Sequence, residues 1–258
     1  MKIGKARMVL IAGAAIVSLA GLAPAAGAAE FSVGAGVGVV PDYEGSQDFA
    51  PTVVPYVNAV WSNNLSFNLL GGKAKANLIP SPMWKGGVVG EYIPERADVD
   101  SSAVDNMQDV DTSFMVGGFV GFDVEGWSAS IEAMKDAAGG NDGSILRLNG
   151  GYRLPIDQRL SLALGVFATW ADDNYMDAYF SVSAADARRS GLRMYDADAG
   201  LKDMGASVTV TYKMAETWGL KGLVSYKALV NDAADSPVVD NEGDASQFAA
   251  SVLAYYTF

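Results

Sequence analysis

Apolar and polar side chains alternate along the last thirteen residues of the chain, 246–258. Successive side chains of a strand point to opposite sides, so the pattern predicts a β-strand with one wholly apolar face. That face comprises Phe248, Ala250, Val252, Ala254, Tyr256 and Phe258. The segment is long enough for a tilted strand to cross a bilayer. We expect it to close a membrane barrel, with Tyr256 and Phe258 as the terminal aromatic signal for the barrel-assembly machinery.

The same period of two recurs along most of the chain and predicts an all-β protein. Twelve segments show it: 31–40, 49–61, 64–69, 72–79, 84–93, 112–124, 127–134, 144–152, 160–170, 204–212, 218–230 and 246–258. The segments on either side of Gly72 are the weakest pair, because they could form one bent strand. Since single-chain bacterial barrels have an even number of strands, we expect twelve strands, with ten as the alternative.

The connections between these segments alternate between short and long. The turns at 62–64, 125–126, 154–157 and 213–217 are short, whereas 95–111, 171–203 and 231–245 are long and polar. Outer-membrane barrels have short periplasmic turns and long external loops. The pattern therefore favours a transmembrane antiparallel up-and-down β-barrel with both termini in the periplasm.

The five tryptophans agree with this architecture. Each is placed at the end of a predicted strand: Trp170 on the external side, and Trp61, Trp84, Trp127 and Trp218 on the periplasmic side. Aromatic side chains gather at the two membrane interfaces of barrels. A soluble β-sandwich is the alternative, but it offers no reason for this placement.

The first 29 residues resemble a secretory signal peptide. Lys2, Lys5 and Arg7 precede an uncharged apolar run over 8–21, and small residues at 26–29 offer a cleavage site. The apolar run is short for a membrane-spanning anchor. We therefore expect residues 1–29 to be removed, which leaves one barrel domain over 30–258. The protein is predicted to reside in the outer membrane of a Gram-negative bacterium.

Composition excludes several functional classes. Removing three basic residues and no acidic one with the signal peptide changes the net charge from −12 to −15, which disfavours nucleic-acid binding. There is no Cys and no His, so thiol chemistry, a Ser-His-Asp triad and the commonest metal ligand are all missing. We expect no enzymatic activity, no catalytic residues, no cofactor and no metal site. The weaker alternatives are acid–base chemistry at Asp172 and Asp173 and Ca²⁺ binding by the acidic run 98–111, which lacks EF-hand spacing.

Glycines occupy alternate positions at Gly34, Gly36 and Gly38 in the first predicted strand. A phosphate-binding glycine loop needs a helix after it, but the loop Pro-Asp-Tyr-Glu-Gly-Ser follows here, at 41–46. We therefore expect these glycines to keep the inner side of the barrel wall thin or to let it bend.

Eight short stretches, taken in order, resemble the MipA/OmpV (MltA-interacting protein) family of outer-membrane proteins. They are GVVPDYEGS (38–46), NLIP (77–80), ERADVD (95–100), DDNYMDAYF (172–180), SGL (190–192), AGLKD (199–203), DSP (235–237) and the terminal YTF (256–258). Ser181 departs from the glycine expected there. The resemblance implies a non-enzymatic barrel that acts as a scaffold, bringing a lytic transglycosylase together with a murein synthase. Other members are porin-like channels, adhesins or proteins that respond to osmotic or antibiotic stress, so a porin-like role stays open.

The residues that we single out as loop or lumen contacts lie in two of these stretches. They are Asp42, Tyr43, Glu44, Asp172, Asp173, Tyr175, Tyr179 and Phe180. The plain alternative is that the aromatic members pack the loops against the barrel rim. Charges predicted to point inward could line a pore or pair with each other as a plug; they are Glu132, Arg147, Arg153, Lys213, Lys221 and Lys227.

The expected partners follow from location and from the family resemblance. A membrane barrel contacts outer-membrane lipid and lipopolysaccharide along its apolar wall. A scaffold would bind the periplasmic lytic transglycosylase and murein synthase at its periplasmic end. That end comprises the region near Glu30 and the turns at 62–64, 125–126, 154–158 and 213–217.

Overall fold

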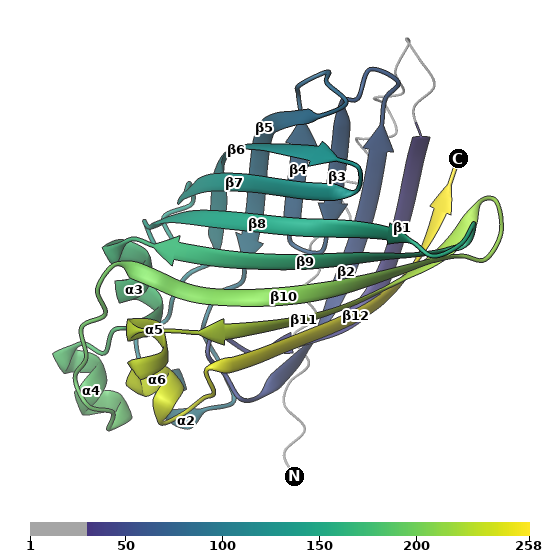
Figure 1. Ribbon diagram of the computed structural model, residues 1–258. Coiled ribbons are helices and arrows are strands. Elements are labelled where there is room, and N and C mark those ends of the chain that lie inside the picture. Colours follow the sequence, from purple (N-terminus) through teal and green to yellow (C-terminus); the bar gives the residue numbers. More distant parts are fainter. Residues whose placement is uncertain (1–29) are drawn as a thin grey trace.

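The computed structural model describes residues 30–258, and the predicted signal peptide, 1–29, lies outside the described residues. Residues 30–258 form a closed barrel of twelve strands, each antiparallel to its neighbours (Figure 1). The strands are β1 (Glu30–Pro41), β2 (Phe49–Val60), β3 (Ser66–Leu70), β4 (Lys73–Asn77), β5 (Trp84–Ile93), β6 (Ser113–Val124), β7 (Trp127–Asp136), β8 (Ser144–Pro155), β9 (Leu160–Ala171), β10 (Gly200–Lys213), β11 (Trp218–Leu229) and β12 (Ser246–Thr257). The prediction of twelve strands is confirmed, and the alternative of ten is wrong.

The last strand closes the barrel against the first, as predicted. The register between β1 and β12 runs from Ser32 opposite Thr257 to Val39 opposite Ala250. Beyond it, the Phe258 N–H donates to the Phe31 carbonyl at 2.9 Å. Closure leaves no free strand edge between β1 and β12, which a membrane barrel requires because lipid offers no hydrogen-bond partners.

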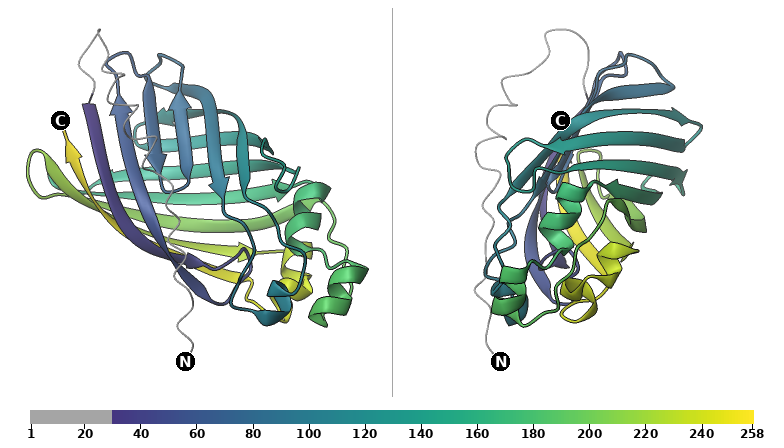
Figure 2. Two further views of the ribbon diagram at one scale, coloured as in Figure 1. Left: turned by 180° about the vertical axis from the view of Figure 1, so that it is seen from behind. Right: turned by 90° about the vertical axis from the view of Figure 1, so that its left-hand side faces the viewer.

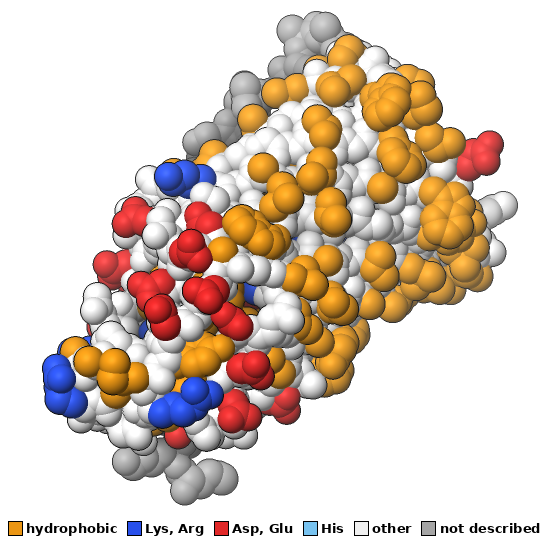
Figure 3. All heavy atoms as spheres, turned by 60° about the vertical axis from the view of Figure 1, so that its left-hand side comes forward, with side chains coloured by type: hydrophobic (Ala, Val, Ile, Leu, Met, Phe, Trp, Pro, Cys, Tyr) orange, Lys and Arg blue, Asp and Glu red, His pale blue; other side chains and the backbone are white. Residues whose placement is uncertain are grey.

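Apolar side chains cover the outside of the strand wall, and acidic side chains gather at one end of the molecule (Figure 3). On β12, Phe248 and Val252 are exposed, whereas Leu253 and Tyr255 on the opposite face are buried inside. The alternation read from the sequence therefore gives the correct faces. The tryptophans also lie where predicted: Trp84, Trp127 and Trp218 each begin a strand, Trp61 follows one, and Trp170 is the last residue but one of its strand.

The two ends of the barrel differ in their connections (Figures 1 and 2). We call the end that carries the connections 42–48, 94–112, 137–143, 172–199 and 230–245 the loop end. The opposite end, which carries the turns 61–65, 125–126, 156–159 and 214–217 and both Glu30 and Phe258, is the turn end. Five short helices gather at the loop end: α2 (Ser102–Asp105), α3 (Asp173–Phe180), α4 (Ala184–Ser190), α5 (Asp232–Asp235) and α6 (Pro237–Asp240). Within residues 30–258, no helix has the length and apolar run needed to span a membrane.

Two sequence expectations are wrong in detail. The predicted alternation of short and long connections fails after β3, where Gly71 and Gly72 form a tight turn and β3 and β4 are only five residues each. Gly71 has a φ of +58°, a left-handed conformation that glycine adopts without strain. The long loop predicted over 171–203 is also shorter, because β10 begins at Gly200 and contains a bulge between Leu201 and Asp203. The bulge matters for the interior because it buries two consecutive charged residues, Lys202 and Asp203.

Candidate functional site

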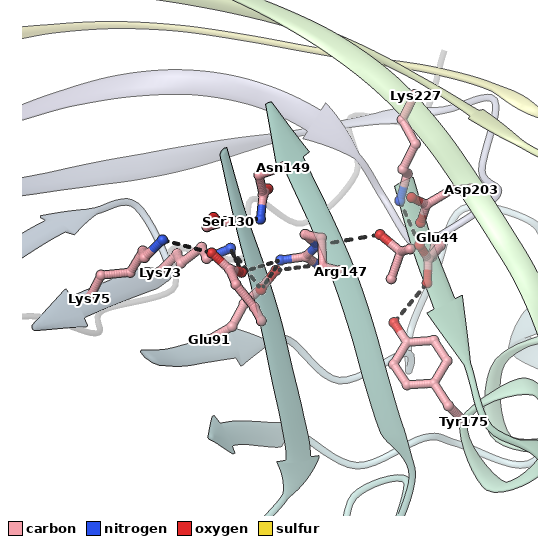
Figure 4. Close-up of polar contacts among 12 residues, drawn as sticks. Glu44, Lys73, Lys75, Glu91, Ser130, Arg147, Asn149, Tyr175, Asp203 and Lys227 are labelled. Atoms are coloured by element: carbon pink, nitrogen blue, oxygen red, sulfur yellow. Dashed lines mark hydrogen bonds and ion pairs between the residues drawn. The ribbon is translucent and has the colours of Figure 1, made fainter. Parts of the chain in front are cut away.

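Glu44, in the loop between β1 and β2, is the centre of a charged cluster at the loop end of the lumen (Figure 4). Its Oε1 accepts hydrogen bonds from Lys202 Nζ at 2.6 Å and from Lys227 Nζ at 2.5 Å. Its Oε2 accepts from the Tyr175 hydroxyl at 2.9 Å. Lys202 also donates to Asp203 Oδ2 at 2.5 Å. These five residues, which we call the Glu44 cluster, tie the loop 42–48 and helix α3 to strands β10 and β11.

Electrostatics explain why this cluster holds its charges. Burial raises the pKa of Glu44, but the charges of Lys202 and Lys227 lower it by more than burial raises it. The pKa of Glu44 therefore lies well below the ordinary value. Burial, followed by the charge of Glu44, raises the pKa of Tyr175 well above its ordinary value. Glu44 is therefore ionised and Tyr175 is a neutral donor at neutral pH.

A second set of ion pairs lies on the inner wall between β4 and β8 (Figure 4). Glu132 of β7 accepts from Lys73 Nζ at 2.6 Å and from Lys75 Nζ at 2.8 Å, although β4 is three strands away. Arg147 of β8 makes a two-point contact with Glu91 of β5, at 2.6 Å and 3.4 Å. Lys73 is 3.9 Å from Glu91 and joins the two pairs. We call these five residues the mid-barrel network.

The turn-end half of the lumen holds an apolar cluster. Val54, Tyr56, Leu253 and Tyr255 are buried together there. The two tyrosine rings lie 5.8 Å apart edge to face, and Lys221 Nζ is 5.3 Å and 5.4 Å from their centroids. We call these four residues and Lys221 the turn-end aromatic cluster.

The glycines of β1 make room for this cluster. A Cβ added to Gly36 would lie 2.0 Å from the Val252 carbonyl oxygen and 2.5 Å from Leu253 Cα. A Cβ on Gly34 would lie 2.8 Å from Tyr255 Cβ. The expectation that these glycines keep the inner wall thin is confirmed, and the reason is the close approach of β12 and its large inward side chains.

The structure gives most of the predicted loop residues a packing or capping role. Tyr43, Tyr175, Tyr179 and Phe180 are all buried. Asp172 caps helix α3 by accepting from the Tyr175 N–H at 3.1 Å, and Asp173 accepts from the Ala199 N–H at 2.7 Å. Asp42 accepts from the Asp100 N–H at 3.0 Å. Of the eight residues singled out, Glu44 and Tyr175 are brought together directly in the lumen.

Arg96 connects the loops to each other at the loop end. Its Nη1 donates to the Tyr179 carbonyl at 2.8 Å, and its Nη2 donates to the Gln108 carbonyl at 3.4 Å. Burial lowers the pKa of Arg96, while nearby Tyr179 and Tyr43 act in the opposite direction. Burial, together with the charge of Glu242, raises the pKa of Tyr43 to about 12, so this side chain stays neutral beside the arginine.

Sequence reasoning found part of the charged interior and missed the rest. Glu132, Arg147, Lys221 and Lys227 point inward as predicted, whereas Arg153 and Lys213 share inward faces but are exposed at the turn-end rim. Glu91, Lys202 and Asp203 were not singled out. A lone charge among glycines and valines of a membrane strand is the signal that could have identified Glu91. Within residues 30–258, no group of three or more acidic, His or Cys side chains is arranged to hold a metal ion.

Comparison with known proteins places the chain in a family. A sequence model of the family described as MltA-interacting protein MipA matches residues 33–258. The MltA-interacting protein of Escherichia coli (strain K12) is 27% identical over 238 residues, which cover 90% of this chain and 92% of that relative. The putative outer membrane protein YiaT of Escherichia coli O157:H7 is 29% identical over 148 residues, and that match spans 57% of this chain and 58% of the relative.

Solved outer-membrane proteins resemble the barrel more distantly. The COG4313 outer membrane channel from Pseudomonas putida F1 has a TM-score of 0.45 and 9% identity, with 91% of this chain and 97% of that chain covered. The NanC porin has a TM-score of 0.40 and 10% identity, with 89% of this chain and 99% of that chain covered. Likenesses at this level carry no functional conclusion. On the family match over residues 33–258, the chain belongs to the MltA-interacting protein (MipA) family, and it is an outer-membrane β-barrel.

Proposed function

We propose that this protein is a non-enzymatic outer-membrane scaffold with a closed lumen, which binds peptidoglycan-remodelling enzymes at its turn end. The partners would be a lytic transglycosylase and a murein synthase, as the family resemblance implies; the relative in Escherichia coli is named MltA-interacting protein. In this arrangement the turn end and both termini face the periplasm, where the peptidoglycan lies.

The large and charged side chains that point into the lumen are the observation that carries this proposal. Barrels of eight strands fill with side chains, and barrels of sixteen or more leave a channel, so a barrel of twelve strands can do either. Here three groups of inward side chains occupy the lumen: the Glu44 cluster, the mid-barrel network and the turn-end aromatic cluster. A lumen closed by these side chains would leave the two ends of the barrel as the places where a partner binds.

The turn end carries an apolar surface suited to a protein partner. Ile156 is 50% exposed and Met214 is 57% exposed, each in a turn rather than on the strand wall. The two turns are neighbours, because the Lys213 N–H donates to the Arg159 carbonyl at 2.8 Å. We call Ile156 and Met214 the turn-end patch. Contiguous exposed apolar patches with a polar rim mark protein-binding surfaces, and we assign the partner to this pair of neighbouring turns.

Capture of the two enzymes tests the proposal. The protein is purified from outer membranes in detergent, and the binding of purified lytic transglycosylase and murein synthase is measured. The double variant Ile156→Asp/Met214→Asp should bind the transglycosylase at least about tenfold more weakly. Met194→Asp is the matched control, because Met194 is 63% exposed in the loop 172–199 at the opposite end. Equal binding by the wild type and the double variant would exclude this surface, and loss of binding in the control alone would place the partner at the loop end.

A further inference from the structure

The barrel wall is incomplete between the tip of the β3–β4 hairpin, at Gly71 and Gly72, and the loop end. The pairing between β2 and β3 covers only the stretch from Val60 to Tyr56, so the rest of β2 has no strand on that side. On the other side of the hairpin, β4 pairs with β5 only as far as Glu91. The Gly71 N–H donates to the Pro55 carbonyl at 2.9 Å, and the Tyr92 N–H donates to the Gly72 carbonyl at 2.8 Å. The wall is closed up to that level, and beyond it β2 and β5 have no strand between them.

The free edge of β2 is chemically suited to remain unpaired. The Pro55 carbonyl points toward the hairpin. Because residues an even number apart in a strand direct their backbone N–H and C=O groups to the same side, the backbone of Pro51 faces that side too. Neither proline has an N–H, and prolines on an edge prevent further strands from pairing. Between them, the Val53 carbonyl accepts a hydrogen bond from Thr52 Oγ1 at 3.4 Å. The gap is therefore a feature of the sequence of β2, since an edge meant for another strand would keep its donors.

A cavity of about 810 Å³ extends from this gap into the lumen. Thr52, Val53, Gly71 and Tyr92 line it at the gap, and Val53 faces outward with 47% of its surface exposed. Deeper inside, residues of the Glu44 cluster and the mid-barrel network line the same cavity. Its volume is in the range of small-molecule sites. An apolar rim at the membrane and a charged interior match an amphiphile, with its chain outside and its polar group inside.

Two unsatisfied polar atoms indicate the chemistry of that polar group. Within residues 30–258, the buried side-chain atoms that lack a hydrogen-bond partner are Arg96 Nε and Asp203 Oδ1, and both residues line this cavity. Buried polar atoms are normally paired, so each exception needs an explanation. One is a cationic donor and the other is an anionic acceptor. A ligand that satisfies both carries an anionic oxygen and a hydrogen-bond donor such as an ammonium group.

We propose that the gap between the β3–β4 hairpin and the loop end is a lateral portal for a zwitterionic phospholipid. The lipid places its phosphate and ammonium groups in the cavity, while its acyl chain stays in the membrane. Arg96 binds the phosphate, and Asp203 binds the ammonium. Lys73 and Lys227 also line the cavity, and their side chains remain partly exposed there. This site is independent of the turn-end patch, so each can fail without the other.

Binding of lysophosphatidylethanolamine, a single-chain lipid with both groups, tests this site. The protein purified from outer membranes is titrated in detergent, and bound lipid is counted by native mass spectrometry. We expect saturable binding of one molecule, at least tenfold tighter than lysophosphatidylglycerol, which has the phosphate but no ammonium. Asp203→Asn should reduce this preference for the ammonium lipid. Equal binding of both lipids by the wild type would overturn the proposal.

A second pair of variants tests the portal without altering the charged interior. Val53→Trp places a large ring at the rim of the gap and should weaken binding at least tenfold. Val166→Trp is the matched control, because Val166 is 60% exposed on β9, whose pairing to β8 and β10 is complete. A heat-shift gel confirms that both variants are folded. Unchanged binding in Val53→Trp, or equal loss in both variants, would show that the lipid binds elsewhere on the wall and would overturn the portal.

Discussion

Glu44 and Lys202 lie 158 residues apart in the chain, yet Glu44 Oε1 is 2.6 Å from Lys202 Nζ inside the barrel. The contact joins a seven-residue loop, 42–48, to a strand on the far side of the β1–β12 seam. Lys202 is almost fully buried, so its ammonium depends on Glu44 and Asp203 for compensation. This pair is therefore one of the contacts that hold the loop in the mouth of the barrel, together with the hydrogen bond from the Gly45 N–H to Gln247 Oε1.

Replacing Glu44 with Gln should destabilise the loop end. The substitution leaves Lys202 and Lys227 with one fewer carboxylate, and removing one partner of a buried ion pair costs about 3–5 kcal/mol. Urea unfolding of the refolded barrel in detergent measures the loss. The exposed residue Gln47, changed to Ala in the same loop, is the control and should change stability by less than about 0.5 kcal/mol. Equal stability of Glu44→Gln and the wild type would contradict the structural role of the cluster.

The contribution of Glu44 should depend on pH only in acid. Its pKa is lower in the folded protein than in the unfolded chain, so its stabilisation is fully present above the unfolded value, about 4.3. The stabilisation is lost as the pH falls through the depressed folded pKa. The difference in unfolding free energy between wild type and Glu44→Gln should thus stay constant from pH 7 to pH 5 and shrink below about pH 4.3. A difference that shrinks between pH 7 and pH 5 would show that Glu44 has a raised pKa instead.

Two substitutions of Tyr175 distinguish how much its hydrogen bond and how much the packing of its ring contribute to stability. Tyr175→Phe removes the hydroxyl that donates to Glu44 at 2.9 Å, and a hydrogen bond to a charged group is worth about 1.5–3 kcal/mol. Tyr175→Ala also removes a buried ring, so its cost should rise to about 3–5 kcal/mol. Limited proteolysis of the segment 172–199 gives a second measure, with cleavage faster in the Ala variant. Equal cost for the two variants would mean that the ring contributes nothing beyond the hydroxyl.

Gly36 should be essential for closing the barrel. A Cβ there meets backbone atoms of Val252 and Leu253, which cannot move without separating β1 from β12. Gly36→Ala should cost about 3 kcal/mol or more and leave little folded protein on a heat-shift gel. Gly222→Ala on β11 is the matched control, because a Cβ at Gly222 has no neighbour within 4 Å. Normal folding of Gly36→Ala would show that the seam is looser than the structure indicates.

The strand wall could be predicted from the sequence because its signal is local. Alternation over ten or more residues specifies both faces of a strand, and it placed Leu253 and Tyr255 inside and Val252 outside correctly. The hairpin at Gly71 was uncertain because β3 and β4 are too short for the alternation to be decisive. The short hairpin leaves a gap in the wall, and that gap can be recognised only from the pairing of β3 with β2 and of β4 with β5.

The charged interior could be predicted only in part, because its pairs join distant strands. Glu132 and Arg147 were expected to point inward, but their partners lie three strands away, and the sequence does not specify the barrel shear that brings them together. The sequence predicts a loop at Lys202, since a bulge that turns two consecutive charged side chains inward breaks the period of two. Helices α3 to α6 were likewise hidden in segments too short and polar to show a helical period.

The closed lumen is most directly tested by planar-bilayer conductance of the protein purified from outer membranes. A heat-shifted band on a gel confirms beforehand that the protein is folded. The three groups of inward side chains predict a silent bilayer, while a variant that removes inner charges, Glu91→Ala/Glu132→Ala, should produce fluctuating current. Steady, reproducible conductance steps in the wild type would contradict the closed lumen and would favour a porin-like channel over the scaffold.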